Sequence, residues 1–299
     1  MNSFCTKISV TIPTYNNFES FKRALNSVLC QKFEDYEIVI TDDSSNDDIK
    51  NFVEPLNNSK IKYFKNPTPL GPPENWNEGI RRASGEYIKI LHHDDWLADE
   101  NSLGKFIKLM EENPDSDFGY AKSVDIETET GKIKTRNAQK YVKKLEKNCF
   151  ELFFSNRIGA PSVVIFRNSN DFFFDKNLKW LVDTEFYIMC LLKNNNIAFL
   201  DEVLINIGIS NTQVTKSCTD NQDVEIFEQF YVYDKYKTHL AQPEYQKELI
   251  SLLKKFKIKD LENLNKIVPN DIEIPEKIIK YLSKRTKNKL CLKNFFHFS

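Results

Sequence analysis

The sequence predicts an α/β domain followed by a helical extension. Two observations lead to this fold class. Short β-rich runs alternate with segments of helical periodicity through the first hundred residues, whereas the chain from about residue 224 onward has a helical pattern rich in Lys and Glu. Strands that alternate with helices at this spacing indicate βαβ units, and hence a parallel sheet with right-handed crossovers.

The elements of the first hundred residues follow from the hydrophobic pattern. We expect strands at residues 8–12, 37–41, 61–64 and 87–91, and helices at residues 18–31, 47–56 and 74–83. The first helix has a regular apolar period, formed by Phe18, Phe21, Leu25, Val28 and Leu29.

After Trp96 the pattern is less regular. We expect helices near residues 102–111, 141–154 and 184–192, and strands near residues 118–125 and 163–166. These elements place an α/β domain over residues 1–215, with halves at 1–100 and 101–215, and a helical extension over residues 216–299.

The composition argues against several classes of protein. The 299 residues carry 42 Lys and Arg against 43 Asp and Glu, so the surface has no global basic excess for coating nucleic acid. The mean hydropathy is −0.50. No run approaches the ~18–20 apolar residues of a membrane-spanning helix, and the N-terminal residues show no signal-peptide pattern. We therefore expect a soluble protein of the cytoplasm.

Six cysteines are scattered through the chain, without a C-x-x-C pair or histidines at ligand spacing. Neither a zinc site nor a disulfide framework is evident from this spacing. We expect reduced thiols.

The C-terminal segment, residues 277–299, has an unbalanced charge. It carries seven Lys and Arg residues and no acid, interspersed with apolar and aromatic residues. Such a segment can lie on an anionic membrane surface, or it can form a solvated helix with a frayed tail. Both interpretations stay open on the sequence alone.

Polar residues gather where three predicted strands end. Residues 13–17 (PTYNN) follow the first strand, residues 42–45 (DDSS) the second and residues 92–96 (HHDDW) the fourth. Because ligands of parallel sheets bind at the carboxyl ends of the strands, we expect these loops to share one edge. An aromatic ring, an acid for a base N–H and a carboxylate pair for a divalent cation together suit a nucleotide. Each loop alone also fits capping, turn formation or packing.

Four segments together resemble the successive motifs of family 2 glycosyltransferases, inverting enzymes of the GT-A fold that use nucleotide-activated sugars. The segments are residues 8–17 (ISVTIPTYNN), 36–47 (YEIVITDDSSND), 85–97 (GEYIKILHHDDWL) and 180–187 (WLVDTEFY). The resemblance covers about residues 7–215. It implies a GT-A catalytic domain, a Rossmann-like mixed sheet flanked by helices, whose first half binds the nucleotide-sugar and whose second half binds the acceptor.

The resemblance implies donor-binding roles in the first two loops. Pro13 and Tyr15 would line the base pocket. Asp43 would accept a hydrogen bond from the base N3–H, while Asp42 shapes the loop. An N3–H suits uracil or thymine, which favours UDP- or dTDP-sugars. Asn75 lies where the family has a polar helix start near the donor, and it can also be a capping or packing residue.

The fourth strand is followed by the family's metal motif. By the resemblance, Asp95 ligates a divalent cation, Mn²⁺ or Mg²⁺, on the donor diphosphate, and Asp94 contacts ribose or sugar. The chain departs from the fuller D-x-D-D form, because His92 replaces the first Asp. The departure leaves the metal mainly on Asp95 and puts strict metal dependence in question.

Asp183 matches the family's catalytic base, which takes the proton from an acceptor hydroxyl as that oxygen attacks the anomeric carbon. Glu185 is the rival base, two residues further on. Asp183 also fits a helix N-cap, a role compatible with catalysis.

Two further segments have an implied place near the donor. Ala160 and Pro161 belong to residues 159–162, which resemble the segment near the transferred sugar and can equally be a loop entering the next strand. Near residues 207–215, where the family often carries an Arg and a His, this sequence has Gly208 and Ser210 instead. Contact with the diphosphate from this segment is then absent or comes from a lysine such as Lys216.

The resemblance implies an inverting, hexosyltransferase-type enzyme that moves a sugar from a nucleotide diphosphate donor to a glycan or lipid-linked acceptor in bacterial surface polysaccharide or lipooligosaccharide synthesis. Residues 277–299 would attach it to the inner face of the cell membrane. One alternative is a non-catalytic nucleotide-sugar-binding or scaffold protein. Another is a sugar-1-phosphate nucleotidyltransferase, although residues 13–17 lack the Gly-rich basic loop that a triphosphate needs. No GxGxxG follows a strand, which disfavours a dinucleotide oxidoreductase.

Overall fold

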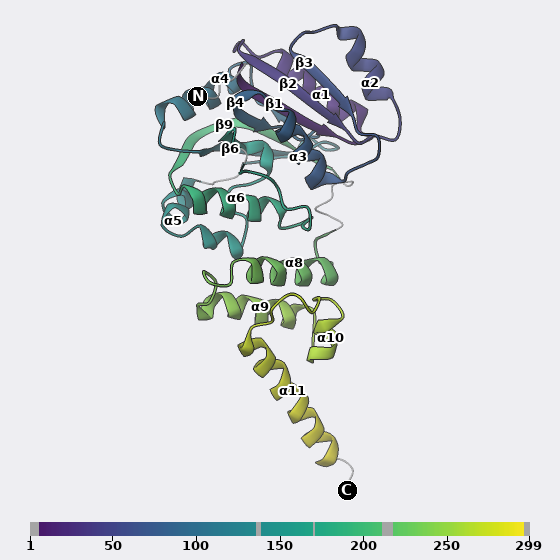
Figure 1. The fold of residues 1–299 in the computed structure, drawn as a ribbon, viewed down its shortest axis with the longest axis vertical. Coiled ribbons are helices and arrows are strands. Elements are labelled where there is room, and N and C mark those ends of the chain that lie inside the picture. Colours follow the sequence, from purple (N-terminus) through teal and green to yellow (C-terminus); the bar gives the residue numbers. More distant parts are fainter. Residues whose placement is uncertain (1–5, 136–138, 170, 211–217, 296–299) are drawn as a thin grey trace. The chain divides into compact units, whose positions relative to one another are not determined.

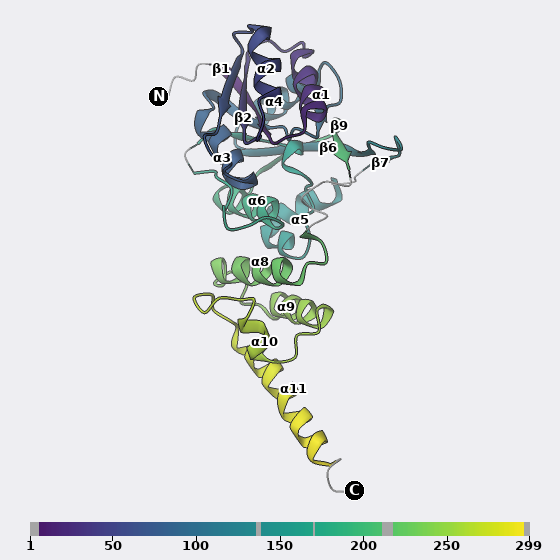
Figure 2. The ribbon, with the colours of Figure 1, turned by 90° about the vertical axis from the view of Figure 1, so that its right-hand side faces the viewer.

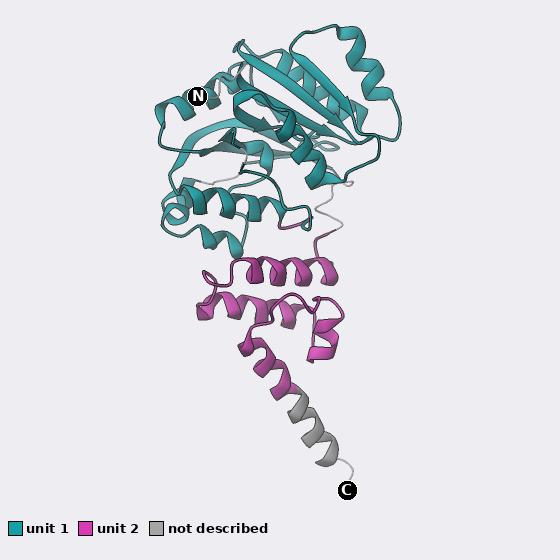
Figure 3. Cartoon of the chain, viewed as in Figure 1, with its two compact units in different colours: residues 1–178, 182–213 teal, residues 179–181, 214–299 magenta. Residues whose placement is uncertain are grey.

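The computed structural model describes residues 6–135, 139–169, 171–210 and 218–295, with side chains described up to residue 285. The chain divides into two compact units (Figure 3). Unit 1 comprises residues 1–178 and 182–213, and unit 2 comprises residues 179–181 and 214–299. Free thiols in the described part are Cys30, Cys149, Cys190 and Cys218.

Unit 1 is built on one nine-stranded sheet, flanked by helices (Figure 1). The strands are β1 (Thr6–Thr14), β2 (Tyr36–Asp42), β3 (Ile61–Lys65), β4 (Gly85–Ile90), β5 (Trp96–Leu97), β6 (Phe118–Glu127), β7 (Ile133–Thr135), β8 (Val164–Arg167) and β9 (Ile197–Ile209). They follow the order β3-β2-β1-β4-β8-β6-β9-β5, and β7 pairs with β6.

The first four strands form the parallel part of the sheet. β1 pairs in parallel with both β2 and β4, and β2 pairs in parallel with β3. The helices α1 (Phe18–Leu29), α2 (Asp48–Val53) and α3 (Pro72–Arg82) connect these strands. Figure 2 shows α1 and α3 on opposite faces of the sheet. β2 is therefore buried along its whole length, as expected for a strand covered on both faces.

The remaining strands make the sheet mixed, as the fold class implied by the resemblance requires. β8 runs antiparallel to both of its neighbours, β4 and β6. β6 pairs in parallel with β9, with irregular register around residues 121–123. The hydrophobic pattern did not predict β9, because the exposed Asp201 and Glu202 interrupt its apolar residues.

The helices of the second half differ in part from the expected ones. α4 (Ser102–Glu112) and α6 (Val182–Lys193) lie where the periodicity predicts them. The helix expected over residues 141–154 is instead the short α5 (Val142–Lys147) between the 3₁₀ turns Gln139–Tyr141 and Cys149–Phe153. The Asn148 side chain accepts from the amide of Phe150 and starts the second turn, so the continuous helix ends there.

Unit 2 consists of α8 (Gln222–Lys235), α9 (Pro243–Lys255), α10 (Leu261–Asn265) and α11 (Glu276–Phe295). Ile278 and Leu282 of α11 are fully buried. The carboxylate of Glu228 in α8 accepts backbone hydrogen bonds of 2.8, 2.9 and 2.7 Å from residues 179, 180 and 181, which fixes this short segment. No helix in the described ranges is both long and apolar enough to pass through a bilayer.

Candidate active site

The carboxyl ends of β1 and β2 lie side by side, because Thr14 is in register with Asp42. Their loops are tied together by Asn16, whose backbone adopts a positive φ of 52°. The Asn16 amide donates to the Ser44 hydroxyl at 2.8 Å, and its side-chain oxygen accepts from the Ser45 amide at 2.9 Å. These bonds join the first two polar loops that the sequence predicts to share an edge.

Two predicted donor residues at the end of β1 and just after it differ in exposure. Pro13 is buried, whereas Tyr15 is 55% exposed. A large aromatic ring that stands in solvent is free to stack on a planar ligand.

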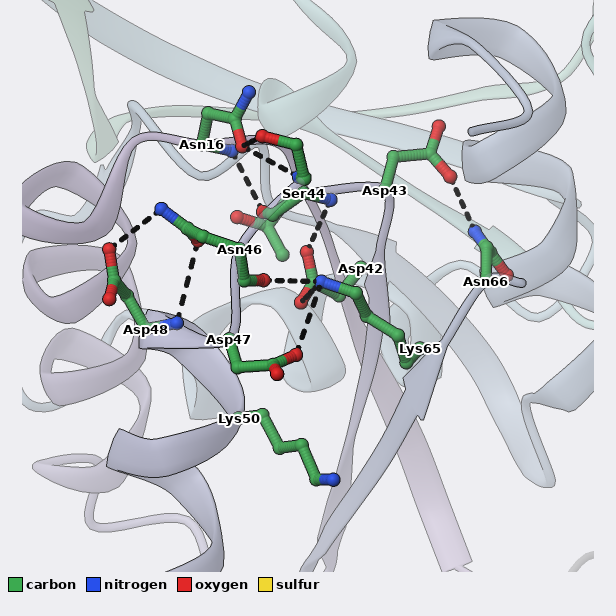
Figure 4. A network of polar contacts seen from close by, with 12 residues as sticks. Asn16, Asp42, Asp43, Ser44, Asn46, Asp47, Asp48, Lys50, Lys65 and Asn66 are labelled. Atoms are coloured by element: carbon green, nitrogen blue, oxygen red, sulfur yellow. Dashed lines mark hydrogen bonds and ion pairs between the residues drawn. The ribbon is translucent and has the colours of Figure 1, made fainter. Parts of the chain in front are cut away.

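Asp42 is fully buried and holds the loop after β2 in shape (Figure 4). Its carboxylate accepts from the Ser44 amide at 2.7 Å, the Tyr63 hydroxyl at 2.6 Å and the Lys65 ammonium at 3.2 Å. Burial and the neighbouring Asp42 raise the pKa of Tyr63, so its hydroxyl stays a donor. Asp42 is therefore engaged within the protein.

Asp43 connects the same loop to the start of α3. One carboxylate oxygen accepts from the Asn66 amide group at 2.7 Å, and the other accepts from the amides of Leu70 and Gly71 at 3.0 and 2.9 Å. Figure 4 shows Asp43 and Asn66 facing each other. Gly71 has a φ of 83°, a conformation that glycine adopts without strain.

Asn75 is buried and bonded within the protein. Its amide group donates to the Thr41 carbonyl at 3.1 Å, and its oxygen accepts from Asn66 at 2.9 Å. The packing interpretation of Asn75 thus has direct structural support, and Asn75 also buttresses the partner of Asp43.

The loop after β4 brings three possible metal ligands together. One ligand atom from each of His92, Asp94 and Asp95 lies within 4.8 Å of the others. Asp95 is 2% exposed, and its Oδ1 accepts from the Gly208 amide at 3.1 Å. Burial, followed by the charge of Asp94, raises the pKa of Asp95. A divalent cation stabilises such a cluster, because its positive charge offsets the negative charge that two adjacent carboxylates bring into a buried place.

Burial lowers the pKa of His92 to about 4, which leaves a neutral imidazole. Neutral imidazole and carboxylate oxygens are both metal ligands, so the three side chains fit a divalent cation.

Lys89 lies beneath this loop and was not among the residues that the sequence singled out. It is fully buried, and its ammonium donates to the carbonyls of Ile90, at 3.0 Å, and Ser162. Burial lowers its pKa to about 7, against the opposing attraction of Asp95. A buried lysine within electrostatic reach of Asp95 can supply positive charge to the Asp94–Asp95 pair.

Arg23 of α1 supports the same loop from its other side, and sequence reasoning also missed it. Its Nη2 donates to the backbone carbonyl of Asp94 at 3.1 Å, and its guanidinium lies 4.0 Å from the centroid of the Trp96 ring. Arginine is rare in this chain relative to lysine. The rarity of arginine could have marked Arg23 as a candidate. A planar guanidinium can stack on a ring and donate hydrogen bonds at the same time, which lysine cannot do.

Asp183 lies in the first turn of α6 and is partly exposed. Burial raises its pKa to about 7, the range in which a carboxylate can take a proton at neutral pH. The rival Glu185 has no exposed surface. Its partial exposure therefore favours Asp183 over the fully buried Glu185 for contact with an acceptor hydroxyl.

The segment that contains Ala160 and Pro161 links α6 to the loop of His92, Asp94 and Asp95. The Tyr187 hydroxyl of α6 donates to the Gly159 carbonyl at 3.0 Å. At the other end, Ser162 accepts from the His92 amide at 2.9 Å and hydrogen-bonds Asp95. Ala160 and Pro161 lie between these two anchors.

Trp76 and Phe174 make a second link between the two halves of unit 1. The Trp76 ring contacts the His92 ring and the Phe174 ring, and Phe174 stacks on Phe186 of α6 at 4.1 Å. Lys216, the other sequence candidate, lies outside the described residues.

Comparison with known sequences and structures gives one family. The sequence model of glycosyl transferase family 2 matches residues 9–177, more than half of the chain. A GalNAc(5)-diNAcBac-PP-undecaprenol beta-1,3-glucosyltransferase of Campylobacter jejuni is 42% identical over 94 residues, which span 30% of each chain. The Escherichia coli UDP-Glc:alpha-D-GlcNAc-diphosphoundecaprenol beta-1,3-glucosyltransferase WfgD is 29% identical over 198 residues, 65% of this chain and 73% of that enzyme.

Solved structures agree on the fold. The structure of S. aureus TarS residues 1–349 with UDP-GlcNAc superposes with a TM-score of 0.60 at 20% identity, covering 88% of this chain and 84% of that one. The mannosyltransferase PcManGT of Pyrobaculum calidifontis with GDP-Man and Mn²⁺ gives 0.57 at 12% identity, covering 100% and 89%. The predicted GT-A fold is thereby confirmed, and the chain belongs to glycosyl transferase family 2.

Proposed function

We propose that this glycosyltransferase moves a sugar, with inversion at the anomeric carbon, from a UDP- or dTDP-sugar to a hydroxyl of a lipid-linked glycan in the synthesis of a bacterial surface polysaccharide. The observation that carries the proposal is the linked arrangement in unit 1. Residues 159–162 hydrogen-bond both to the helix of Asp183 and to the loop of Asp95. A general base and a metal-binding loop that are both hydrogen-bonded to the same short segment suit a reaction at a single anomeric carbon.

In the proposed donor site, Tyr15 stacks on the base and Asp43 accepts from its N3–H. Asp43 uses its two oxygens for three internal bonds, and a carboxylate has about four acceptor positions, which leaves room for one more donor. Asp95, with Asp94 beside it, would hold a divalent cation, Mn²⁺ or Mg²⁺. The cation would supply charge neutralisation for the departing diphosphate.

Asp183 is the proposed general base. It takes the proton of the acceptor hydroxyl while that oxygen forms a bond to the anomeric carbon and the bond from this carbon to the diphosphate oxygen breaks. Its pKa of about 7 leaves a substantial unprotonated fraction near neutral pH. Single displacement from the face opposite the leaving group inverts the centre, so an α-linked donor gives a β-linked product.

Two relatives support the choice of acceptor. The names of the Campylobacter jejuni and Escherichia coli enzymes specify undecaprenol-linked substrates. A lipid-linked acceptor lies at a membrane surface, and the basic segment 277–299 suits attachment to the cytoplasmic face of that membrane. In this proposal the enzyme acts from the cytoplasm as a peripheral protein.

A screen of nucleotide-sugars by thermal shift, with Mn²⁺ and with EDTA, tests the donor. We expect a UDP- or dTDP-sugar to raise the melting temperature most. Transfer to a diphosphoundecaprenol-linked sugar, followed by NMR of the anomeric proton, tests acceptor and inversion. Stabilisation by no nucleotide-sugar would support a scaffold protein instead, and a product that retains the donor configuration would overturn inversion.

A further inference from the structure

His92 replaces a carboxylate of the metal motif, yet the structure keeps it beside the two remaining acids. One of its ring nitrogens lies within 4.8 Å of ligand atoms of both Asp94 and Asp95. The replacement therefore leaves a possible ligand at this place and changes its chemistry from oxygen to nitrogen.

The position of the His92 ring is restrained by one backbone hydrogen bond and one contact with a neighbouring ring. Its backbone amide donates to the Ser162 hydroxyl at 2.9 Å, and its ring centroid lies 4.4 Å from that of Trp76. The backbone bond and the ring contact restrict the imidazole before any ligand arrives. Restricting a ligand side chain in this way is what a preorganised metal site requires.

The ring nitrogen Nε2 of His92 is buried and has no hydrogen-bond partner among the described residues. Burying a polar nitrogen without a partner costs free energy, and most buried polar atoms in folded proteins are paired. This nitrogen belongs to the imidazole ring that lies beside the carboxylates of Asp94 and Asp95. A cation in this cluster would give the imidazole the partner that the protein does not provide.

We propose that His92 is a direct ligand of the divalent cation, together with Asp94 and Asp95, and that this mixed nitrogen–oxygen set favours a transition-series ion such as Mn²⁺ over Mg²⁺. The inference rests on the proposed function, because it concerns the cation of the same site. Mg²⁺ prefers oxygen ligands and dehydrates reluctantly, whereas imidazole is a good ligand for transition-series ions.

The direct test is pulsed EPR of Mn²⁺ bound to the full chain in the presence of UDP. Electron spin echo modulation from a coordinated ¹⁴N is expected in the wild type. Protein labelled with ¹⁵N-histidine should replace the ¹⁴N pattern with a ¹⁵N pattern, which assigns the nitrogen to histidine rather than to uracil without any mutation. Mn²⁺ that binds without histidine modulation would overturn the inference and leave the proposed transfer reaction untouched.

Two variants identify the histidine. His92→Asp restores the family's carboxylate, so it should still bind metal, lose the nitrogen modulation and lower the ratio of Mn²⁺ to Mg²⁺ affinity by roughly tenfold, the scale of a changed metal-site side chain. His93→Gln is the matched control, since the His93 ring faces the Pro13 carbonyl at 3.3 Å, and it should keep the modulation. Modulation that persists in His92→Asp would assign the ligand elsewhere and refute the inference.

Outcomes of the donor screen separate the inference from the proposed function. Donor stabilisation that is equal in Mn²⁺ and in EDTA, with no bound Mn²⁺ detected, would refute the ligand role of His92 while the donor proposal stands. Metal binding with histidine modulation but without stabilisation by any nucleotide-sugar would support the ligand role and contradict the donor proposal.

Discussion

The amide of Gly208 donates a 3.1 Å hydrogen bond to Oδ1 of Asp95, across 113 residues of sequence. A Cβ added at Gly208 would lie 2.3 Å from the carbonyl oxygen of Asp94, far inside van der Waals contact. β9 therefore approaches the Asp94–Asp95 loop as closely as a glycine allows. The resemblance implies an Arg and a His near residues 207–215. This chain has Gly208 there, and its backbone amide fixes the carboxylate of Asp95.

We expect Gly208→Ala to displace the Asp94–Asp95 loop or β9, because the backbone oxygen of Asp94 cannot yield as a flexible side chain would. Metal-dependent donor binding should weaken and the melting temperature should fall. Gly104→Ala is the matched control, since its Cβ would meet Phe33 at an ordinary 3.7 Å within α4. The control should be neutral or stabilising by up to about 1 kcal/mol. Wild-type metal-dependent donor binding in Gly208→Ala would contradict the prediction.

Asp183→Asn should remove the general base and lower kcat by about 10²–10⁴-fold, with donor affinity changed only a few-fold. Asp171→Asn serves as the control. This exposed acid pairs with Lys193 of α6, the helix that contains Asp183, and has no proposed role in catalysis. Rapid-quench turnover and calorimetric donor binding measure both quantities. Wild-type turnover in Asp183→Asn would show that another group takes the proton.

Asp183 also predicts a pH dependence of stability. Its pKa is raised from 3.8 to about 7, so the folded protein binds a proton more tightly than the unfolded chain. The associated stability is complete below pH 3.8 and is lost as pH rises through about 7. The melting temperature of Asp183→Asn minus that of the wild type should therefore increase from pH 4 to 7 and then level off. A difference that is constant with pH would contradict the raised pKa.

Lys89→Met should change the pH profile in a different window. The pKa of Lys89 is lowered from 10.5 to about 7, so the unfolded chain holds this proton more tightly. Wild-type stability should gain relative to Lys89→Met as pH rises from about 7 to 10.5, because fewer unfolded molecules keep the proton. Melting curves in metal-free buffer at several pH values measure this gain. A relative stability that stays flat or falls over this range would mean that the buried lysine keeps its proton and that the lowered pKa is absent.

Tyr15→Ala should weaken nucleotide binding without loss of stability, because the ring is 55% exposed in the free protein. Stacking on a base contributes about 1–3 kcal/mol, which corresponds to roughly 5- to 150-fold in affinity. Tyr15→Phe keeps the ring and should bind UDP as the wild type does. Equal UDP affinity in Tyr15→Ala would exclude a stacking role.

Removal of residues 286–299 should lower binding to anionic liposomes while leaving the fold of unit 2 intact. This cut keeps the buried Ile278 and Leu282, whereas a cut at residue 277 would remove them. Replacing Lys287, Lys289 and Lys293 by Gln in the full chain separates charge from apolar contact. Sedimentation with liposomes measures both variants, each cation contributing about 1 kcal/mol near an anionic surface. Undiminished sedimentation of the shortened protein would locate membrane attachment elsewhere or exclude it.

The sequence predicted the β1–β4 part of the sheet because its strands and helices alternate with regular apolar periods and polar turns. It failed for β9, where Asp201 and Glu202 are exposed on a strand whose other residues are buried or half-buried. The periodicity of a segment carries no information about the strands that pair with it. For β9 these partners are β6 and β5. The loops of Tyr15, Asp43 and Asp95 could be predicted because their residue types follow strand ends directly.

The supporting residues of the site could not be predicted in the same way. From the sequence, Lys89 is expected to be an exposed residue of an alternating strand. In the fold it is buried, and its ammonium donates to the carbonyl of Ser162, 73 residues later. Arg23 belongs to a helix whose apolar face dominates its pattern, and its bond to Asp94 spans 71 residues. Such contacts depend on tertiary packing, which one sequence does not specify by motif.

The bonds of residues 159–162 also determine where this enzyme can be recombined with its relatives. A chimera that takes residues 101–215 from another family member would bring a foreign segment 159–162 against the native His92 loop. The hydrogen bond between Ser162 and the His92 amide would then cross between the two parents, whereas the bond between Tyr187 and Gly159 would stay within one of them. Such a graft should therefore succeed when the His92 loop, residues 159–162 and Tyr187 come from a single parent.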